Sequence, residues 1–151
     1  MQTLNERSKL FFIDLVKEAT LIHSTELNFR GKIALTIELW IDDKPTLRGK
    51  LKSYILANYR TELVFVPEIA FFLLDTQGPG ETDHRKIMVL PQWVYLESTT
   101  GKEISAELTS SGDIQVDPAL NARHCRVAEA WLAGLELDGF ARPEDRDQLL
   151  A

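Results

Sequence analysis

The chain of 151 residues has little cysteine and no long hydrophobic run. Its one cysteine, Cys125, cannot form an internal disulfide, which favours a reducing compartment. The longest apolar stretch, at 63–74, is interrupted by Pro67 and Glu68 and is shorter than the roughly 20 residues of a membrane-spanning helix. The N-terminal apolar run at 10–16 contains an aspartate and lacks a following cleavage site, unlike a signal peptide. We therefore expect a cytoplasmic protein with no membrane segment.

The sequence also lacks an excess of positive charge. Its net charge is −6, and all of it comes from the second half. Residues 1–76 carry 10 basic and 10 acidic side chains, whereas residues 77–151 carry 7 and 13. Because phosphate contacts supply most non-specific affinity for nucleic acid, nucleic acid is an unlikely general partner. The acidity suits solubility first and a basic protein partner second.

Motifs of catalysis are missing as well. The three histidines, His23, His84 and His124, stand in no metal-ligand spacing, and the chain has no G-x-S-x-G elbow. His124 and Cys125 are neighbours on a predicted helix, where their side chains point about 100° apart, so they do not form a Cys/His nucleophile pair. We expect His124 to be a core-edge residue with a hydrogen-bond partner and Cys125 to be a small hydrophobic residue at the flank of an apolar stripe. The sequence predicts no cofactor and leans against an enzyme.

The loop at 75–85 holds a weak candidate for a metal site. Glu81, Asp83 and His84 cluster there, and carboxylate oxygens with an imidazole can hold a divalent ion. The spacing does not match an EF-hand loop. A solvated acidic loop tip is therefore the favoured interpretation.

The clearest pattern in the sequence is an alternation of apolar and polar residues. Apolar residues at every second position of 33–41 predict a half-buried antiparallel strand. A turn at 42–45 and a strand at 46–57 would complete a hairpin. Segment 86–97 is apolar in both parities and bends at Pro91, which predicts a central strand covered on both faces. Further expectations are a turn at 28–31, strands at 62–66, 104–108 and 114–116, and a buried element of uncertain type at 69–74.

Two helices bracket these strands. Thr3 and Glu6 form a capping box that opens a helix at 4–22, and Asp117 with Pro118 opens a second helix that stops near 139–140. We predict one α+β domain spanning 1–151, with 143–151 as a frayed tail. Its core is an antiparallel, strongly curved sheet of about five to seven strands, with the N-terminal and C-terminal amphipathic helices packed on it.

The most distinctive surface is the outer face of the first hairpin. Arg48, Lys50, Lys52 and Tyr54 stand at alternate positions and are predicted to share a strand face, to which the neighbouring strand adds Trp40. A tryptophan on the polar side of a strict alternation has three explanations. A helix of the same chain covers it, it anchors an interface, or it stacks on bases beside a basic row.

We therefore interpret the chain as a non-enzymatic protein-binding module, such as an adaptor, small chaperone, inhibitor, immunity protein or assembly factor. Its partner would be another protein or a second copy in a homodimer. The first alternative is a ligand-binding or enzymatic domain whose curved sheet encloses a pocket, with Gln92, Ser53 or Glu107 facing inward. The second alternative is a nucleic-acid accessory protein that uses the basic hairpin.

Overall fold

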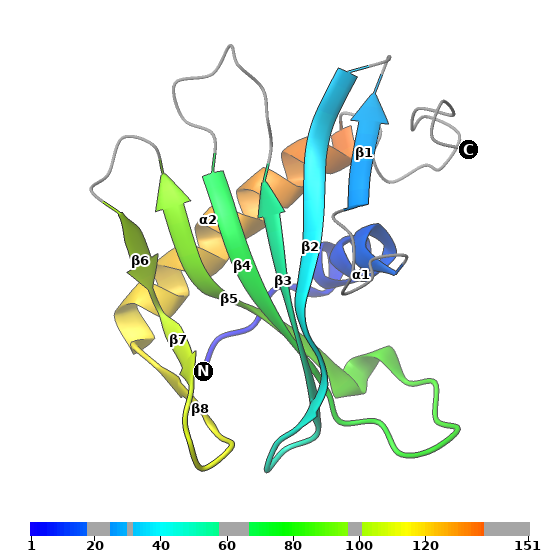
Figure 1. Ribbon diagram of the computed structural model, residues 1–151, viewed down its shortest axis with the longest axis vertical. Coiled ribbons are helices and arrows are strands. Elements are labelled where there is room, and N and C mark those ends of the chain that lie inside the picture. The colour runs from blue at the N-terminus through cyan, green and yellow to red at the C-terminus, as the bar shows by residue number, and fades with distance from the viewer. Residues whose placement is uncertain (18–24, 30–31, 58–66, 97–100, 138–151) are drawn as a thin grey trace.

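The computed structural model describes residues 1–17, 25–29, 32–57, 67–96 and 101–137, which form two antiparallel sheets and two long helices (Figure 1). The large sheet has six strands in the order β1-β2-β3-β4-β5-β6, so each strand pairs with the next along the chain. The elements are α1 (Glu6–Val16), β1 (Thr25–Phe29), β2 (Lys32–Pro45), β3 (Lys50–Ala57), β4 (Pro67–Asp75), the 3-10 turn η1 (His84–Lys86), β5 (Ile87–Leu96), β6 (Lys102–Ile104), β7 (Ala106–Leu108), β8 (Ile114–Val116) and α2 (Pro118–Leu137).

The predicted α+β class, with an antiparallel sheet and a helix before and after it, is confirmed. The strong curvature is not confirmed, because the sheet has no strong curl. Four predictions lie outside the described residues: the strand at 62–66, the N-terminal helix beyond Lys17, the helix stop at 139–140 and the tail at 143–151. No helix in the described part of the chain is long and apolar enough to cross a membrane.

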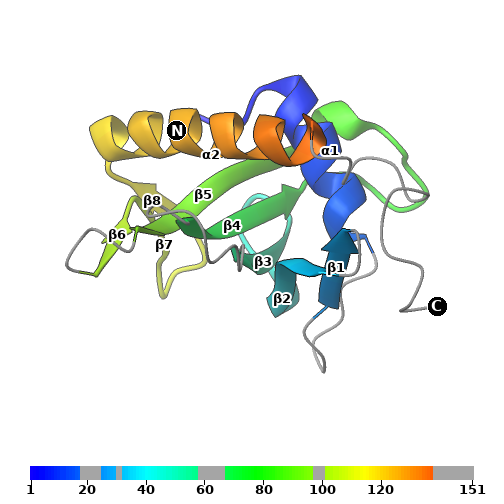
Figure 2. The same cartoon turned by 90° about the horizontal axis from the view of Figure 1, so that it is seen from above.

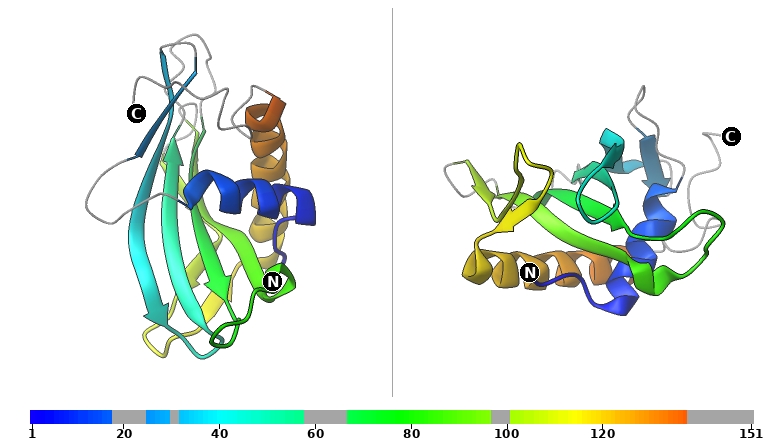
Figure 3. Two further views of the ribbon diagram at one scale, coloured as in Figure 1. Left: turned by 90° about the vertical axis from the view of Figure 1, so that its right-hand side faces the viewer. Right: turned by 90° about the horizontal axis from the view of Figure 1, so that it is seen from below.

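Both helices lie on one face of the large sheet, and the small β7–β8 sheet lies on the other (Figures 2 and 3). The helix side buries the larger core, in which Phe12 of α1 meets Phe71 of β4 with ring centroids 4.7 Å apart. The opposite side has a smaller core under the β7–β8 hairpin, formed by Leu51, Phe72, Leu74, Leu90, Ala106 and Ile114. The hairpin thus covers only part of the outer sheet face.

The helix starts follow from local hydrogen bonding. Asp117 accepts a bond from the Leu120 amide at 3.2 Å and caps α2, with Pro118 in the first helical position as predicted. In α1 the cap is Asn5, whose side chain accepts from the Ser8 amide at 2.8 Å. The predicted Thr3–Glu6 capping box is therefore wrong, because a better-placed Asx residue satisfies the first turn.

The first hairpin turns later than the alternation indicated. Residues 42–45, predicted as a turn, belong to β2, and the chain reverses at 46–49 instead. A register shift between Ile41 and Lys44 absorbs the extra residue, with Asp43 at a φ of 48°. Gly49 then has a φ of +153°, and a Cβ there would lie 2.3 Å from the carbonyl oxygen of Asp75, so the reversal requires glycine.

Other strands also depart from their predicted limits. Residues 28 and 29, predicted to turn, lie in β1, which pairs with β2 from Thr25 opposite Ile37. The predicted strand at 104–108 is divided at Ser105 into β6 of the large sheet and β7 of the small one. The uncertain segment at 69–74 is β4, with all six residues buried, and β5 contributes to both cores as predicted.

Candidate partner-binding face

Tyr54 and Trp40, predicted to share a surface, lie on opposite faces of the sheet. Tyr54 pairs with Leu39 and is 5% exposed in the helix-side core, with its ring edge-on to Phe12 at 5.7 Å. Burial raises the pKa of the Tyr54 hydroxyl. Trp40 is 62% exposed and lines a groove on the outer face. Tyr54 is therefore a core residue, and the predicted five-residue face does not form.

Lys50 and Lys52 share a face with Tyr54, as the alternation predicts, but this face of the sheet is opposite to the one that carries Trp40. Lys52 pairs with Asp42 and Asp43; burial lowers its pKa, but the hydrogen bonds to both aspartates together with nearby charge leave the pKa raised. Arg48 precedes β3 and pairs with Asp113 of the β7–β8 turn at 3.3 Å. Lys50 is exposed at the first position of β3. The three cations thus do not form a stripe beside Trp40, which removes the geometric basis of the base-stacking alternative.

Two β-bulges explain why side chains meet in this groove. Leu39 pairs with Tyr54 and Ile41 with Ser53, so Trp40 is an extra residue on β2. On β5, Pro91 pairs with Phe71 and Trp93 with Ala70, so Gln92 is extra in the same sense. Each bulge directs two consecutive side chains to the outer face, where strict alternation would direct one. All four bulge side chains line the groove: Trp40, Ile41, Gln92 and Trp93.

The groove has a volume of about 270 Å³, an apolar body and a few polar groups. Ser53 and Ile55 of β3 and Lys102 of β6 complete its lining. On its floor the Ser53 hydroxyl donates to Gln92 Oε1 at 3.2 Å. At its ends the Trp40 indole donates to Glu38 at 3.1 Å, and Lys102 Nζ lies 4.1 Å from the centre of a Trp93 ring.

Apolar side chains continue the groove along one cross-strand row. Ile55 pairs with Ala70, Ala70 with Trp93, and Trp93 with Ile104, so these four side chains share the outer face. Ile104 is 47% exposed at the β6 end of the row. With Trp40, the row places apolar side chains on five strands; Trp40 and Ile104 at its two ends are exposed, whereas Ala70 and Trp93 between them are 1% and 7% exposed, and Glu38 and Lys102 rim the row. This combination is typical of a protein contact surface.

The weak metal candidate in the loop before β5 has its charges neutralised by neighbours. Glu81 pairs with Lys86, and Asp83 forms a two-point pair with Arg85, with both bonds between 3.0 and 3.1 Å. These hydrogen bonds lower the pKa of both carboxyl groups. In the part of the chain that the structure describes, no group of three or more His, Cys, Asp or Glu residues is placed to hold a metal ion.

His124 and Cys125 lie in the core rather than in a cleft. His124 is 1% exposed, with Nδ1 2.8 Å from the Ser105 hydroxyl and Nε2 3.4 Å from Glu103, as the predicted core-edge histidine requires. Cys125 is fully buried on α2. Burial raises its pKa to about 11, so it is a poor nucleophile.

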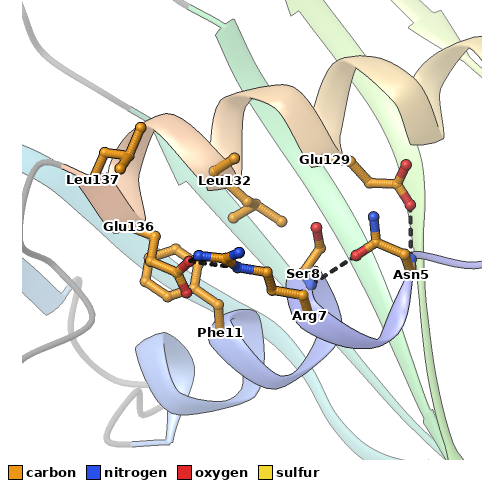
Figure 4. Close-up of a pocket in the computed structure, with 9 residues that line it drawn as sticks. Asn5, Arg7, Ser8, Phe11, Glu129, Leu132, Glu136 and Leu137 are labelled. Atoms are coloured by element: carbon orange, nitrogen blue, oxygen red, sulfur yellow. Dashed lines mark hydrogen bonds and ion pairs between the residues drawn. The ribbon is translucent and has the colours of Figure 1, made fainter.

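A second concavity lies between α1 and α2, with a volume of about 310 Å³ (Figure 4). Phe11 and Leu132 form its apolar floor, and the Arg7–Glu136 ion pair spans it. The sequence carries no signal for this pocket, because its lining comes from two helices that are more than 110 residues apart in the chain.

Sequence reasoning found Trp40 but missed most of its neighbours in the groove. Ser53 and Gln92, which the sequence predicts in an enclosed pocket, meet in this open groove instead, whereas Glu107 is exposed on β7. Ile41 and Trp93 belong to the predicted apolar patterns of 33–41 and 86–97, but the bulges that bring them to the groove are invisible in a pattern of period two, and Lys102 has no sequence signal. Comparison of the chain with protein-family models, with curated proteins and with solved structures found no match in any of the three.

Proposed function

We propose that this chain is a non-enzymatic protein-binding module whose contact surface is the outer sheet face around Trp40. The observation that carries the proposal is the 62% exposure of Trp40 beside an apolar groove. Tryptophan is among the residues most enriched at the energetic centres of interfaces. An indole of this size exposed on an ordered strand is explained by a surface that a partner covers.

The chemistry of the face favours a protein over a small substrate. Its apolar row crosses five strands, its polar rim carries both charge signs, and its floor hydrogen bond joins two neutral side chains. Among the described residues that line the groove, none pairs a nucleophile with a base. An apolar centre with a polar rim is the anatomy of a protein–protein interface.

The proposal includes self-association as one way to cover the face. Glu38 and Lys102 stand at opposite ends of the row, so two copies related by a two-fold axis could place unlike charges together. A lone buried thiol is consistent with the proposed cytoplasmic location.

The experiment compares three purified proteins as bait: wild type, Trp40→Ala and Leu47→Ala. Leu47 is 74% exposed in the β2–β3 turn and is absent from the groove lining, so it controls for loss of any exposed apolar side chain. Sedimentation velocity measures self-association, and quantitative mass spectrometry measures capture from lysate. We expect dimer or one captured protein to be lost with Trp40→Ala and retained with Leu47→Ala.

The result that contradicts the proposal is equally specific. If Trp40→Ala and wild type give the same sedimentation and the same captured proteins, the face is not a contact surface. A binding that is lost with added salt and requires nucleic acid would instead support the accessory role on nucleic acid.

A further inference from the structure

The junction between β6 and β7 lies between the His124 ring on one side and the outer groove on the other, beside the first turns of α2 (Figure 1). Glu103 lies 3.4 Å from ring atom Nε2, and the Ser105 hydroxyl lies 2.8 Å from Nδ1. Lys102 and Ile104 alternate with these two residues and face the other way: Lys102 lines the groove, and Ile104 is 47% exposed at the end of its apolar row. This short stretch of chain thus connects the buried histidine to the groove wall.

Ser105 also holds the bulge of β5 in place. Its amide donates to the Gln92 carbonyl oxygen at 2.9 Å. Its hydroxyl oxygen lies 3.4 Å from the carbonyl oxygen of Pro91 and 3.5 Å from that of Gln92. The Gln92 side chain lines the groove, so a displacement of Ser105 reaches the groove through one hydrogen bond. Because Ser105 is 2% exposed, its contact with His124 is a structural link and not an open nucleophile.

The hydroxyl hydrogen of Ser105 changes its partner when His124 gains a proton. A neutral ring whose Nε2–H faces Glu103 accepts at Nδ1, which uses the single hydrogen of the hydroxyl. A protonated ring donates at both nitrogens, so the hydroxyl accepts from Nδ1 and its own hydrogen turns to the carbonyl oxygens of Pro91 and Gln92. Hydrogen bonds between oxygens are typically about 2.7–2.8 Å long, so this turn draws Ser105 towards β5 by roughly half an ångström.

The second ring nitrogen moves β6 as well. At 3.4 Å its contact with Glu103 is longer than a charge-assisted bond of about 2.7–2.9 Å, so protonation draws β6 towards the ring. Glu103 also pairs with Arg123 through its other oxygen, at 2.9 Å, which holds the carboxylate beside the ring. Burial is the largest influence on the pKa of His124 and lowers it; Glu103 and Asp117 oppose this effect, and Arg123 adds to it. The β5 groups at this junction are backbone carbonyls, which do not titrate.

We propose that His124 is a pH-sensitive switch of the outer groove. Protonation reverses the hydrogen bond between His124 and Ser105, brings the β6–β7 junction closer to the Gln92 bulge and thereby changes the positions of Lys102 and Gln92 in the groove. The conversion takes place below pH 6.5, because burial lowers the pKa of the ring from that value. The coupling is a property of the chain by itself; only its consequence, a contact surface that binds its partner differently in acid, rests on the proposed function.

The test is an NMR titration of the full chain between about pH 7.5 and pH 5, without any partner. It follows the His124 ring, the side-chain amide of Gln92 and the indole N–H of Trp93, which lines the groove beside Gln92. We expect the Gln92 and Trp93 signals to shift with the same midpoint as the ring, below pH 6.5. His84→Gln removes an exposed histidine of η1 and should leave these shifts unchanged.

Ser105→Ala separates the effect of the hydroxyl from the direct effect of the ring charge. The ring still titrates in this variant, but the Gln92 shift should decrease by about fivefold, because alanine has no hydroxyl hydrogen to turn. His124→Gln should abolish the pH-dependent shifts of both groove signals. Trp40→Ala removes the proposed contact residue and should retain them, so the switch is measured even if the face binds no partner.

Two results would overturn the proposal. One is a Gln92 side-chain signal in wild type that does not follow the His124 midpoint, and the other is a shift of wild-type size in Ser105→Ala. If either variant at the junction fails to fold, the comparison of midpoints in wild type decides by itself. Loss of partner capture in Trp40→Ala tests the proposed function and has no bearing on this coupling.

Discussion

The imidazole Nδ1 of His124 lies 2.8 Å from the hydroxyl of Ser105, and both residues are at most 2% exposed. The contact joins α2 to the single residue between β6 and β7, while Nε2 of the same ring lies 3.4 Å from Glu103 of β6. These partners indicate a neutral ring whose Nε2–H faces the carboxylate and whose Nδ1 accepts from Ser105. One histidine thus holds the junction between the two sheets against the helix.

The environment of His124 predicts a pH-dependent stability. Burial lowers its pKa from the ordinary value of 6.5, and this effect outweighs the opposing hydrogen bond to Glu103. A histidine with a lowered pKa in the folded state binds its proton more readily when unfolded, so its contribution is present above pH 6.5 and is lost as pH falls below that value. We expect the melting temperature to decrease between pH 7 and pH 5.

The control for this prediction is His124→Gln, which keeps hydrogen-bonding capacity but does not titrate. The variant should be less stable than wild type at pH 7, and its melting temperature should change less between pH 7 and pH 5. Equal pH slopes for the two proteins would show that other groups cause the dependence.

Tyr54→Ala and Trp40→Ala should separate core from surface. Tyr54→Ala removes a buried ring packed on Phe12 and should decrease the free energy of unfolding by about 3–5 kcal/mol. Trp40→Ala removes an exposed ring and should change it by less than about 0.5 kcal/mol. Urea denaturation measures both, and Tyr54→Phe, which keeps the ring, serves as the matched control. A large loss in Trp40→Ala would mean that the indole packs within the fold.

The sequence predicted those elements whose signals are local. Asp117 and Pro118 marked the start of α2, and the double apolar parity of β5 predicted burial on both faces. The placement of Trp40 and Tyr54 on opposite faces could not be predicted, since it depends on the register of β2 against β3, which sets Tyr54 opposite Leu39. Asp42 and Asp43 resembled a turn because a bulge and a turn both favour residues that tolerate unusual φ angles.

The residue that caps α1 can be tested by comparing Asn5, the observed cap, with Thr3, the predicted one. Asn5→Ala should decrease the free energy of unfolding by about 1 kcal/mol, because the Ser8 amide loses its acceptor. Thr3→Ala should leave it nearly unchanged, since Thr3 does not cap the helix. Urea denaturation measures both variants. An equal decrease in the free energy of unfolding for Thr3→Ala and Asn5→Ala would instead support the predicted Thr3–Glu6 capping box.

Cys125 should be unreactive in the folded protein. Its pKa of about 11 leaves roughly one thiol in a thousand ionised at pH 8, and the sulfur is fully buried near the Gln2 carbonyl. Reaction with a disulfide reagent at pH 8 should therefore be slow in buffer and fast in denaturant. A fast native reaction would show that the start of the chain opens away from α2.

The outer groove depends on the number of residues in β2 and β5 as well as on their types, because each strand has one extra residue, at Trp40 and at Gln92. Substitution at either position changes the lining, but deletion of one residue would restore alternation and move every later side chain of that strand to the other face of the sheet. Related chains could therefore gain or lose this surface by a single codon insertion or deletion, with the helix-side core kept on the N-terminal part of β2. A related chain that lacks one residue at either position is therefore expected to lack the groove.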